Sequence, residues 1–459
     1  METAEQILSS RHLLSRQVMR IALCNLYTTR NNTNELGSIG NVKFEDHFEF
    51  ANKFVGPNGE YFIKGQEDLF NEETGGEYWS RGATEQNFAH IVALGDVHSD
   101  FLSLLSALFL AKVIDVYGRW IASNTIVIQL GDILDRNRPG MDGAKHTSYN
   151  NREEVDIIQY LYHLDMEARV KGSRIISITG NHDIWPYEGP SSRSRKGYVG
   201  QLQLDMYGSM KKRDQYFKSK GMRNYMAWYR PPIMKVNNWL AMHGGIHPDN
   251  LHRRMLELEK SGDNSDPIAW MSDKWMEGIL NPRKNFPAFI MDAMYNRYWA
   301  TNPHDQNVDE CSDHMMTMLR HFNIDSDGGV FLGHTPMWIS KCGNRDGITF
   351  NNIEVVCNAR CTTAACGVVL ADVAASEGFH ELYTGNDPTE IKEYKDEDVQ
   401  STSVVHVNVR KNTLDRIRTD YKYIRIIERF NGKKWNVVKK EKLSRNLKTF
   451  IESVNSVCE

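Results

Sequence analysis

Three apolar runs rich in β-branched residues alternate with helical patterns between His90 and Thr179, and this alternation constrains the fold most strongly. The runs Ile91–Leu94, Thr125–Leu130 and Arg174–Thr179 are too short for helices and have the composition of buried strands. Strands that alternate with helices predict parallel pairing through right-handed crossovers. The chain is therefore expected to have an α/β fold.

Two helices are predicted between these strands, over Phe101–Lys112 and Val155–Val170, where apolar residues recur at helical spacing. Further along the chain, Trp239–Met242 and Gly329–Leu332 are short apolar runs and are predicted to be later strands of the same core. An Asn-Gly dipeptide at Asn431 lies between two β-rich runs, which is typical of a hairpin.

The length of 459 residues is too great for one compact core and predicts a large domain with accessory segments. We expect an N-terminal accessory segment over 1–89 with a helix at Ala4–Tyr27, a main α/β domain over 90–381, and a C-terminal β-rich extension over 382–459. An insertion over 184–238 interrupts the main domain. It is rich in Arg and Lys and is read either as a lid that attracts an anionic substrate or as a solvated accessory subdomain.

Composition excludes several classes of protein. The chain is 41% hydrophobic and 25% charged with a formal net charge of -4, which argues against a nucleic-acid binder. No apolar run approaches the roughly 18 residues of a membrane span, and the N-terminus shows no secretory signal. Seven cysteines, an odd number in a long chain, favour reduced thiols and a cytoplasmic location.

Polar motifs follow five of the apolar runs. They are Gly95-Asp96-Val97-His98, Gly131-Asp132-Ile133-Leu134-Asp135-Arg136, Gly180-Asn181-His182-Asp183, His243-Gly244-Gly245 and Gly333-His334-Thr335. Loops after the strands of a sheet gather at one edge, so their oxygens and imidazoles can converge on two divalent cations. We expect the carboxylate of Asp132 to bridge both cations, because its two oxygens can each bind one.

Taken in order, these motifs resemble the calcineurin-like metallophosphoesterase superfamily. Within it, the segments that begin at His243 and Gly333 are similar to the phosphoprotein phosphatases, especially the Shewanella-like branch. The resemblance covers roughly 90–381 and implies an αββα sandwich, with the N-terminal helical lead-in and the C-terminal β extension outside it.

The resemblance also implies roles for individual residues. Asp96 and His98 would bind the first cation, with Asp132 as the bridge. The remaining roles go to five residues: Asn181, His243 and His334 as ligands of the second cation, His182 as general acid and Asp135 as the group that orients it.

Two arginines are expected to hold the phosphoryl group. Arg136 carries a planar fork of donors that suits phosphate oxygens. Arg297 is assigned as the second arginine from chain order and aromatic neighbours alone. The implied cofactors are two divalent cations, manganese first, with iron or zinc as alternatives.

The expected activity is hydrolysis of phosphate monoesters by a hydroxide held between the two cations, with a phosphorylated protein (Ser/Thr or Tyr) or a small phosphoester as substrate. One alternative is hydrolysis of a nucleotide phosphoanhydride, as in diadenosine tetraphosphate hydrolases. A second is a catalytically weak metal-binding scaffold. No membrane or nucleic-acid partner is expected.

Overall fold

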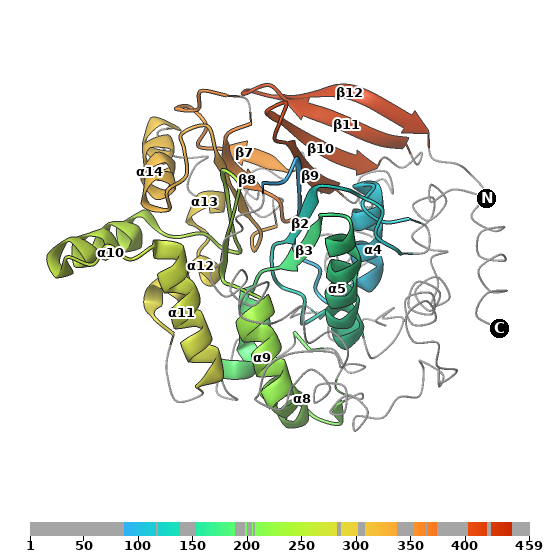
Figure 1. Cartoon of the computed structure of the whole chain (residues 1–459), viewed down its shortest axis with the longest axis vertical. Helices are drawn as coiled ribbons and strands as arrows, with labels where there is room; N and C mark the ends of the chain where they lie inside the picture. Colours follow the sequence, from blue (N-terminus) through green and yellow to red (C-terminus); the bar gives the residue numbers. More distant parts are fainter. Residues whose placement is uncertain are drawn as a thin grey trace, which may run out of the picture.

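The computed structural model of the chain (Figure 1) describes residues 87–115, 118–137, 153–188, 198–199, 204, 207–281, 286–301, 308–336, 353–363, 365–373, 403–419 and 424–442. The predicted helix over Ala4–Tyr27 and nearly all of the segment 1–89 lie outside these residues. None of the helices within the described ranges is both long and apolar enough to cross a bilayer.

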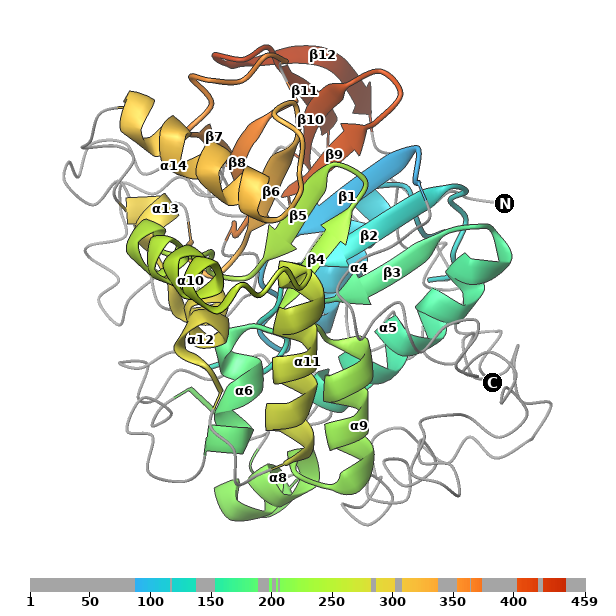
Figure 2. The ribbon, with the colours of Figure 1, turned by 60° about the vertical axis from the view of Figure 1, so that its left-hand side comes forward.

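Seven strands form the first sheet. Their bounds are β1 His90–Leu94, β2 Thr125–Gln129, β3 Arg174–Ser177, β9 Ser403–Asn408, β10 Thr413–Thr419, β11 Ile424–Phe430 and β12 Trp435–Lys442. The order across the sheet is β12-β11-β10-β9-β1-β2-β3. Strands β1, β2 and β3 pair in parallel, which confirms the predicted core. Strand β9 runs antiparallel to β1, so the C-terminal strands continue the same sheet (Figure 2).

Five strands form the second sheet. Their bounds are β4 Ile233–Val236, β5 Trp239–Met242, β6 Gly329–Leu332, β7 Glu354–Val356 and β8 Gly367–Leu370, in the order β4-β5-β6-β8-β7. Strands β5, β6 and β8 are parallel, and the edge strands β4 and β7 are antiparallel to their neighbours. The predicted strands Trp239–Met242 and Gly329–Leu332 form as β5 and β6, and they lie in this second sheet.

The two sheets pack face to face. Successive residues along a strand point alternately into the apolar core between the sheets and into the apolar core under the helices. In β1, Ile91 and Ala93 face the core between the sheets, where Trp239 stacks on Phe331 with ring centroids 4.3 Å apart. The intervening residues of β1 belong to the core under the helices. This alternation is what a strand buried on both faces requires. The result is a sandwich of two mixed sheets with helices outside, the predicted fold class.

Helices pack on the outer faces of the sheets. Their bounds are α4 Phe101–Leu110, α5 Glu153–Val170, α6 Asn181–Glu188, α8 Met210–Phe217, α9 Lys220–Tyr229, α10 Pro248–Ser261, α11 Pro267–Leu280, α12 Ala288–Tyr295, α13 Tyr298–Thr301 and α14 Val308–His321. Helix α5 packs on β3 and α4 on β9, while α11 packs on β4 and α14 on β8. Both views place α8, α9 and α11 together on one side of the sheets (Figures 1 and 2).

The predicted C-terminal hairpin is present. Strands β11 and β12 pair antiparallel, with Phe430 opposite Trp435 across the turn that contains Asn431. Gly432 in this turn has φ +88°, and a Cβ added at this position would have no atom within 4 Å, so glycine serves here for its backbone freedom.

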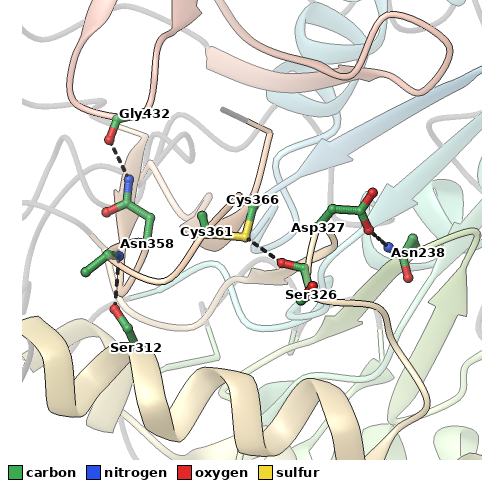
Figure 3. The surroundings of a disulfide bond; sticks show 9 residues. Asn238, Ser312, Ser326, Asp327, Asn358, Cys361, Cys366 and Gly432 are labelled. Atoms are coloured by element: carbon green, nitrogen blue, oxygen red, sulfur yellow. Dashed lines mark hydrogen bonds between the residues drawn. A yellow bond between two sulfur atoms is a disulfide. The ribbon is translucent and has the colours of Figure 1, made fainter. Parts of the chain in front are cut away.

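Four of the seven cysteines form disulfides, Cys311–Cys357 and Cys361–Cys366. The expectation of reduced thiols is therefore wrong for these four. Figure 3 shows the second disulfide in a segment that other contacts also hold: Asn358 donates to the carbonyl of Gly432 at 2.8 Å. This hydrogen bond connects the C-terminal hairpin to the segment between β7 and β8 of the second sheet. The number of cysteines alone could not predict such a long-range contact.

Candidate metal centre

The polar motifs meet at the ends of five strands that belong to both sheets. Asp96 and His98 follow β1; Asp132, Asp135 and Arg136 follow β2; Asn181 and His182 open α6 after β3; His243 follows β5; and His334 follows β6. All nine side chains are buried. The carboxyl ends of parallel strands share one edge of a sheet, and face-to-face packing brings the two edges together.

The backbone of these loops is held in an uncommon conformation. His98, Asp132, Asp135 and His334 have φ of 45°, 53°, 65° and 66°, in the left-handed region that side chains with a Cβ rarely occupy. Backbone hydrogen bonds between loops hold this geometry, such as that from the N–H of His98 to the carbonyl of Asp132 at 2.8 Å. Strain of this kind gathers at functional sites, where the surrounding structure maintains it.

Two glycines of the motifs are required by close approach. A Cβ on Gly180 would overlap the Oδ1 and backbone nitrogen of Asp132, and one on Gly333 would lie 2.6 Å from Oδ1 of Asp96. The strand ends can converge because these positions lack a side chain.

Asp132 lies at the centre of the cluster. Its Oδ2 lies 3.3 Å from Nε2 of His243, 3.7 Å from Nε2 of His98 and 3.8 Å from Nε2 of His182. Two groups of potential metal ligands share this carboxylate, one with His98 and His182 and one with His243 and His334. Asp132 therefore occupies the position that a bridging ligand needs.

Burial and neighbouring charges shift the pKa values of three residues of the cluster. Burial raises the pKa of Asp132, but the nearby His243, His182 and His98 outweigh burial, so its pKa lies well below the usual value. Burial, together with His243 and Arg297, holds the pKa of His334 well below its usual value. For His243, the neighbouring Asp132 outweighs burial and raises the pKa. Asp132 is therefore ionised, and its negative charge favours a cation beside it.

The hydrogen bonds of three imidazoles test whether cations fit. Nδ1 of His98 lies 3.1 Å from the carbonyl of Leu134, and Nδ1 of His243 lies 2.6 Å from that of Leu130. A backbone carbonyl can only accept, so these partners assign the ring proton to Nδ1 and leave Nε2 of both rings as an acceptor facing Asp132.

In His334 the two ring nitrogens have exchanged roles. Its Nε2 lies 3.1 Å from the carbonyl of Tyr295, while its buried Nδ1 has no hydrogen-bond partner within the described part of the chain. A buried nitrogen without a partner is costly, and a metal ion would satisfy it. A backbone carbonyl on one ring nitrogen is also the usual arrangement of metal-binding histidines. The residues therefore fit a pair of divalent cations.

The imidazole of His182 is held in place by its neighbours. Its Nδ1 lies 3.0 Å from Oδ2 of Asp135, and its backbone N–H donates to Oδ1 of Asp132 at 2.8 Å. The imidazole also lies against Trp185, with ring centroids 3.8 Å apart. The carboxylate and the indole fix the ring so that Nε2 is turned toward Asp132.

Both predicted arginines lie at this edge. Arg136 is buried and its Nη1 donates to the carbonyl of Ser99 at 3.2 Å. Nη1 of Arg297 donates to the carbonyl of His334 and to Oγ1 of Thr335, both at 3.1 Å. The structure brings both guanidinium groups to the loops of the site, and their contact with phosphate stays a prediction.

Two further arginines were missed by the sequence analysis, and both come from the insertion 184–238. Nη2 of Arg213 lies 2.6 Å from Oδ1 of Asp135, and Nη2 of Arg230 lies 2.5 Å from Oδ2 of Asp183. Both are fully buried. These two basic residues of the insertion therefore serve the interior, and nothing in their local sequence signals it.

Asp183 holds the loop that carries the bridging carboxylate. Its side chain accepts hydrogen bonds from the backbone N–H groups of Asp132, Ile133 and Gly180 at 2.9, 3.0 and 2.9 Å. Since these N–H groups belong to the loops after β2 and β3, Asp183 and Arg230 lock the two loops together.

Comparisons with known proteins agree with this site. The family described as calcineurin-like phosphoesterase matches residues 89–337. The chain is 31% identical over 163 residues to Shewanella-like protein phosphatase 1 of Plasmodium berghei, covering 34% of this chain and 39% of that protein. It is 35% identical over 114 residues to Shewanella-like protein phosphatase 2 of Arabidopsis thaliana, covering 25% of this chain and 26% of that protein. The matches thus span less than half the length of these two relatives.

Among solved structures, a crystal structure of a point mutant of a cold-active protein tyrosine phosphatase aligns with a TM-score of 0.47 and 16% identity. The alignment covers 83% of this chain and 89% of that one.

Proposed function

The chain belongs to the calcineurin-like phosphoesterase family, and on that premise we propose that it hydrolyses phosphate monoesters on phosphorylated proteins. One observation carries the proposal: acceptor nitrogens of His98, His243 and His334 are left for a cation around the buried Asp132. The two relatives are both named as protein phosphatases, which supports a protein substrate.

Six residues would hold two divalent cations, for which manganese is the first choice. They are Asp96 and His98 for one cation, Asp132 for both, and Asn181, His243 and His334 for the other. Asn181 fits this set, because its Oδ1 lies 3.1 Å from Nε2 of His243. When bound, the cations supply positive charge for the phosphoryl oxygens and lower the pKa of a water ligand.

The residues of the chain perform the remaining steps. Arg136 and Arg297 bind the phosphoryl oxygens and orient the phosphorus atom for in-line attack. His182 donates a proton from Nε2 to the leaving oxygen, and Asp135 holds the ring by its Nδ1 at 3.0 Å. Proton donation of this kind accelerates a reaction by about 10²–10⁴-fold.

The experiment compares metal-loaded wild-type protein with a His182→Asn variant. The substrates are p-nitrophenyl phosphate, peptides with phosphoserine, phosphothreonine or phosphotyrosine, and diadenosine tetraphosphate. We expect turnover of at least one phosphopeptide and a loss of about 10²-fold or more in His182→Asn. A His252→Asn variant is the control, because His252 is exposed on α10.

Faster turnover of diadenosine tetraphosphate than of any phosphopeptide would replace the proposal with a nucleotide phosphoanhydride hydrolase. Stoichiometric bound metal without turnover of any substrate would leave the scaffold alternative standing.

A further inference from the structure

Arg213 reaches the acid side of the site from α8, a helix of the insertion. Its Nη2 lies 2.6 Å from Oδ1 of Asp135 and 2.6 Å from Oε1 of Glu154, and its Nε donates to Oε2 of Glu154 at 3.0 Å. The guanidinium group is fully buried. A planar fork can hold two carboxylates in this way, whereas a single ammonium group cannot reproduce it.

Glu154, at the start of α5, completes the hold on Asp135. Its Oε1 also accepts the backbone N–H of Asp135 at 3.1 Å, and its Oε2 accepts the hydroxyl of Tyr207 at 3.2 Å. Asp135 has φ +65°, so its backbone needs such support. Arg213 and Glu154 therefore fix both the main chain and one carboxylate oxygen of Asp135.

We propose that Arg213 is a positioning residue that sets the orientation of Asp135 and, through it, of the His182 imidazole during proton donation. This role of Arg213 rests on the proposed function, in which His182 is the general acid. Arg213 binds Oδ1 of Asp135, and the other oxygen, Oδ2, lies 3.0 Å from Nδ1 of His182. Without the fork, two carboxylates that now share one nitrogen repel each other, so Asp135 turns away from the ring.

The test uses Arg213→Lys in the full chain, assayed with phenyl phosphate and 2,4-dinitrophenyl phosphate. A poor leaving group needs the acid and a good one does not, so a misplaced acid slows the two reactions unequally. We expect kcat for phenyl phosphate to fall about 10–100-fold, part of the full effect of a general acid. KM, bound metal and kcat for the dinitrophenyl ester should change little.

Two controls separate positioning from general destabilisation. Arg174→Lys is the matched variant, because Arg174 contacts buried Asp165 through two nitrogens at 2.8 and 3.0 Å, as Arg213 contacts Glu154, and lies at the end of β3 away from the site. It should leave the leaving-group pattern as in wild type. In a His182→Asn background, Arg213→Lys should cost no further activity.

A crystal structure of Arg213→Lys gives a readout that needs no activity. We expect the Asp135–His182 contact to lengthen beyond about 3.5 Å, the limit of a hydrogen bond. If the single variant does not fold, Arg213→Met/Glu154→Gln removes one charge of each sign and should show the same pattern.

Equal losses on both esters, a further loss in the His182→Asn background, or an unchanged Asp135–His182 distance would each overturn the proposal. An inactive wild type in which the distance still changes would instead refute the proposed function and retain the positioning role.

Discussion

The buried carboxylates of the C-terminal strands and Asp132 of the metal centre have different kinds of ion-pair partner. In β10 and β11, Asp415 lies opposite Arg429 and Arg416 opposite Glu428, and each acid contacts an arginine within 2.7 Å. In the metal centre, the ion-pair partners of Asp132 within the described residues are histidines. Acids neutralised by arginine in strand register stabilise a sheet, whereas an acid surrounded by imidazoles is open to a cation.

The largest expected effect comes from Asp132→Asn. It removes the carboxylate that both ligand groups share among the described residues, so metal content should fall and activity should drop at least about 10³-fold, equivalent to several kcal/mol. Elemental analysis and turnover measure the two losses. Asp415→Asn is the matched change in the C-terminal strands and should leave turnover intact. An equal loss of turnover in both variants would contradict the contrast between the two regions.

Metal removal is the next test. A ligand that binds only the folded state stabilises it by about 2.7 kcal/mol at a hundredfold excess over Kd. Thermal unfolding should therefore shift downward when a chelator strips the wild type, and much less in Asp132→Asn. A chelator shift of the same size in both proteins would mean that the stabilising metal is bound elsewhere.

Within the C-terminal strands, the two arginines that pair with Glu428 differ in burial. The Arg416 side chain is 10% exposed and that of Arg418 is 29% exposed. We expect Arg416→Met to lower the free energy of unfolding by about 2 kcal/mol and Arg418→Met by less than about 1 kcal/mol. Urea denaturation measures both, and activity should stay constant. The reverse order would show that burial does not set the strength of these pairs.

The smallest effect is a pH dependence at β9. Burial, and next the neighbouring His90, lower the pKa of His406 to about 4. In the unfolded chain, the histidine has a pKa near 6.5 and binds a proton between about pH 6.5 and about pH 4, whereas in the folded state it stays neutral. The free energy of unfolding therefore falls as pH drops from about 6.5 toward about 4. We expect a loss of about 1 kcal/mol between about pH 7 and about pH 5.5.

His406→Asn should remove that part of the pH dependence, as urea midpoints at the two pH values would show. An unchanged slope in the variant would assign the effect to another group.

Local patterns predicted much of the fold and of the candidate site. The alternation of apolar runs located β1, β2 and β3, and the glycine-bounded motifs led to the nine polar residues that the structure gathers at one edge. Such patterns work because strand period, turn residues and ligand chemistry are readable within a few positions. The roles of these nine residues and of Arg297 remain predictions.

The partners of the insertion could not be predicted in this way. Arg213 and Asp135 are 78 positions apart, and Arg230 and Asp183 are 47 apart. Basic residues on a polar stretch are usually solvated, so the sequence favoured a lid or an accessory subdomain. Helix α8 packs against α6, and the guanidinium group of Arg213 reaches the carboxylate of Asp135 once this tertiary contact has formed.

The sequence by itself determined which polar side chains follow the buried strands, because this depends on short-range pattern. The tertiary structure alone decided that β5 and β6 form a second sheet and that the C-terminal strands extend the first. It also decided that two insertion arginines support the carboxylates of the site. These are contacts between distant segments, and their free energy depends on burial and charge pairing that exist only after the chain has folded.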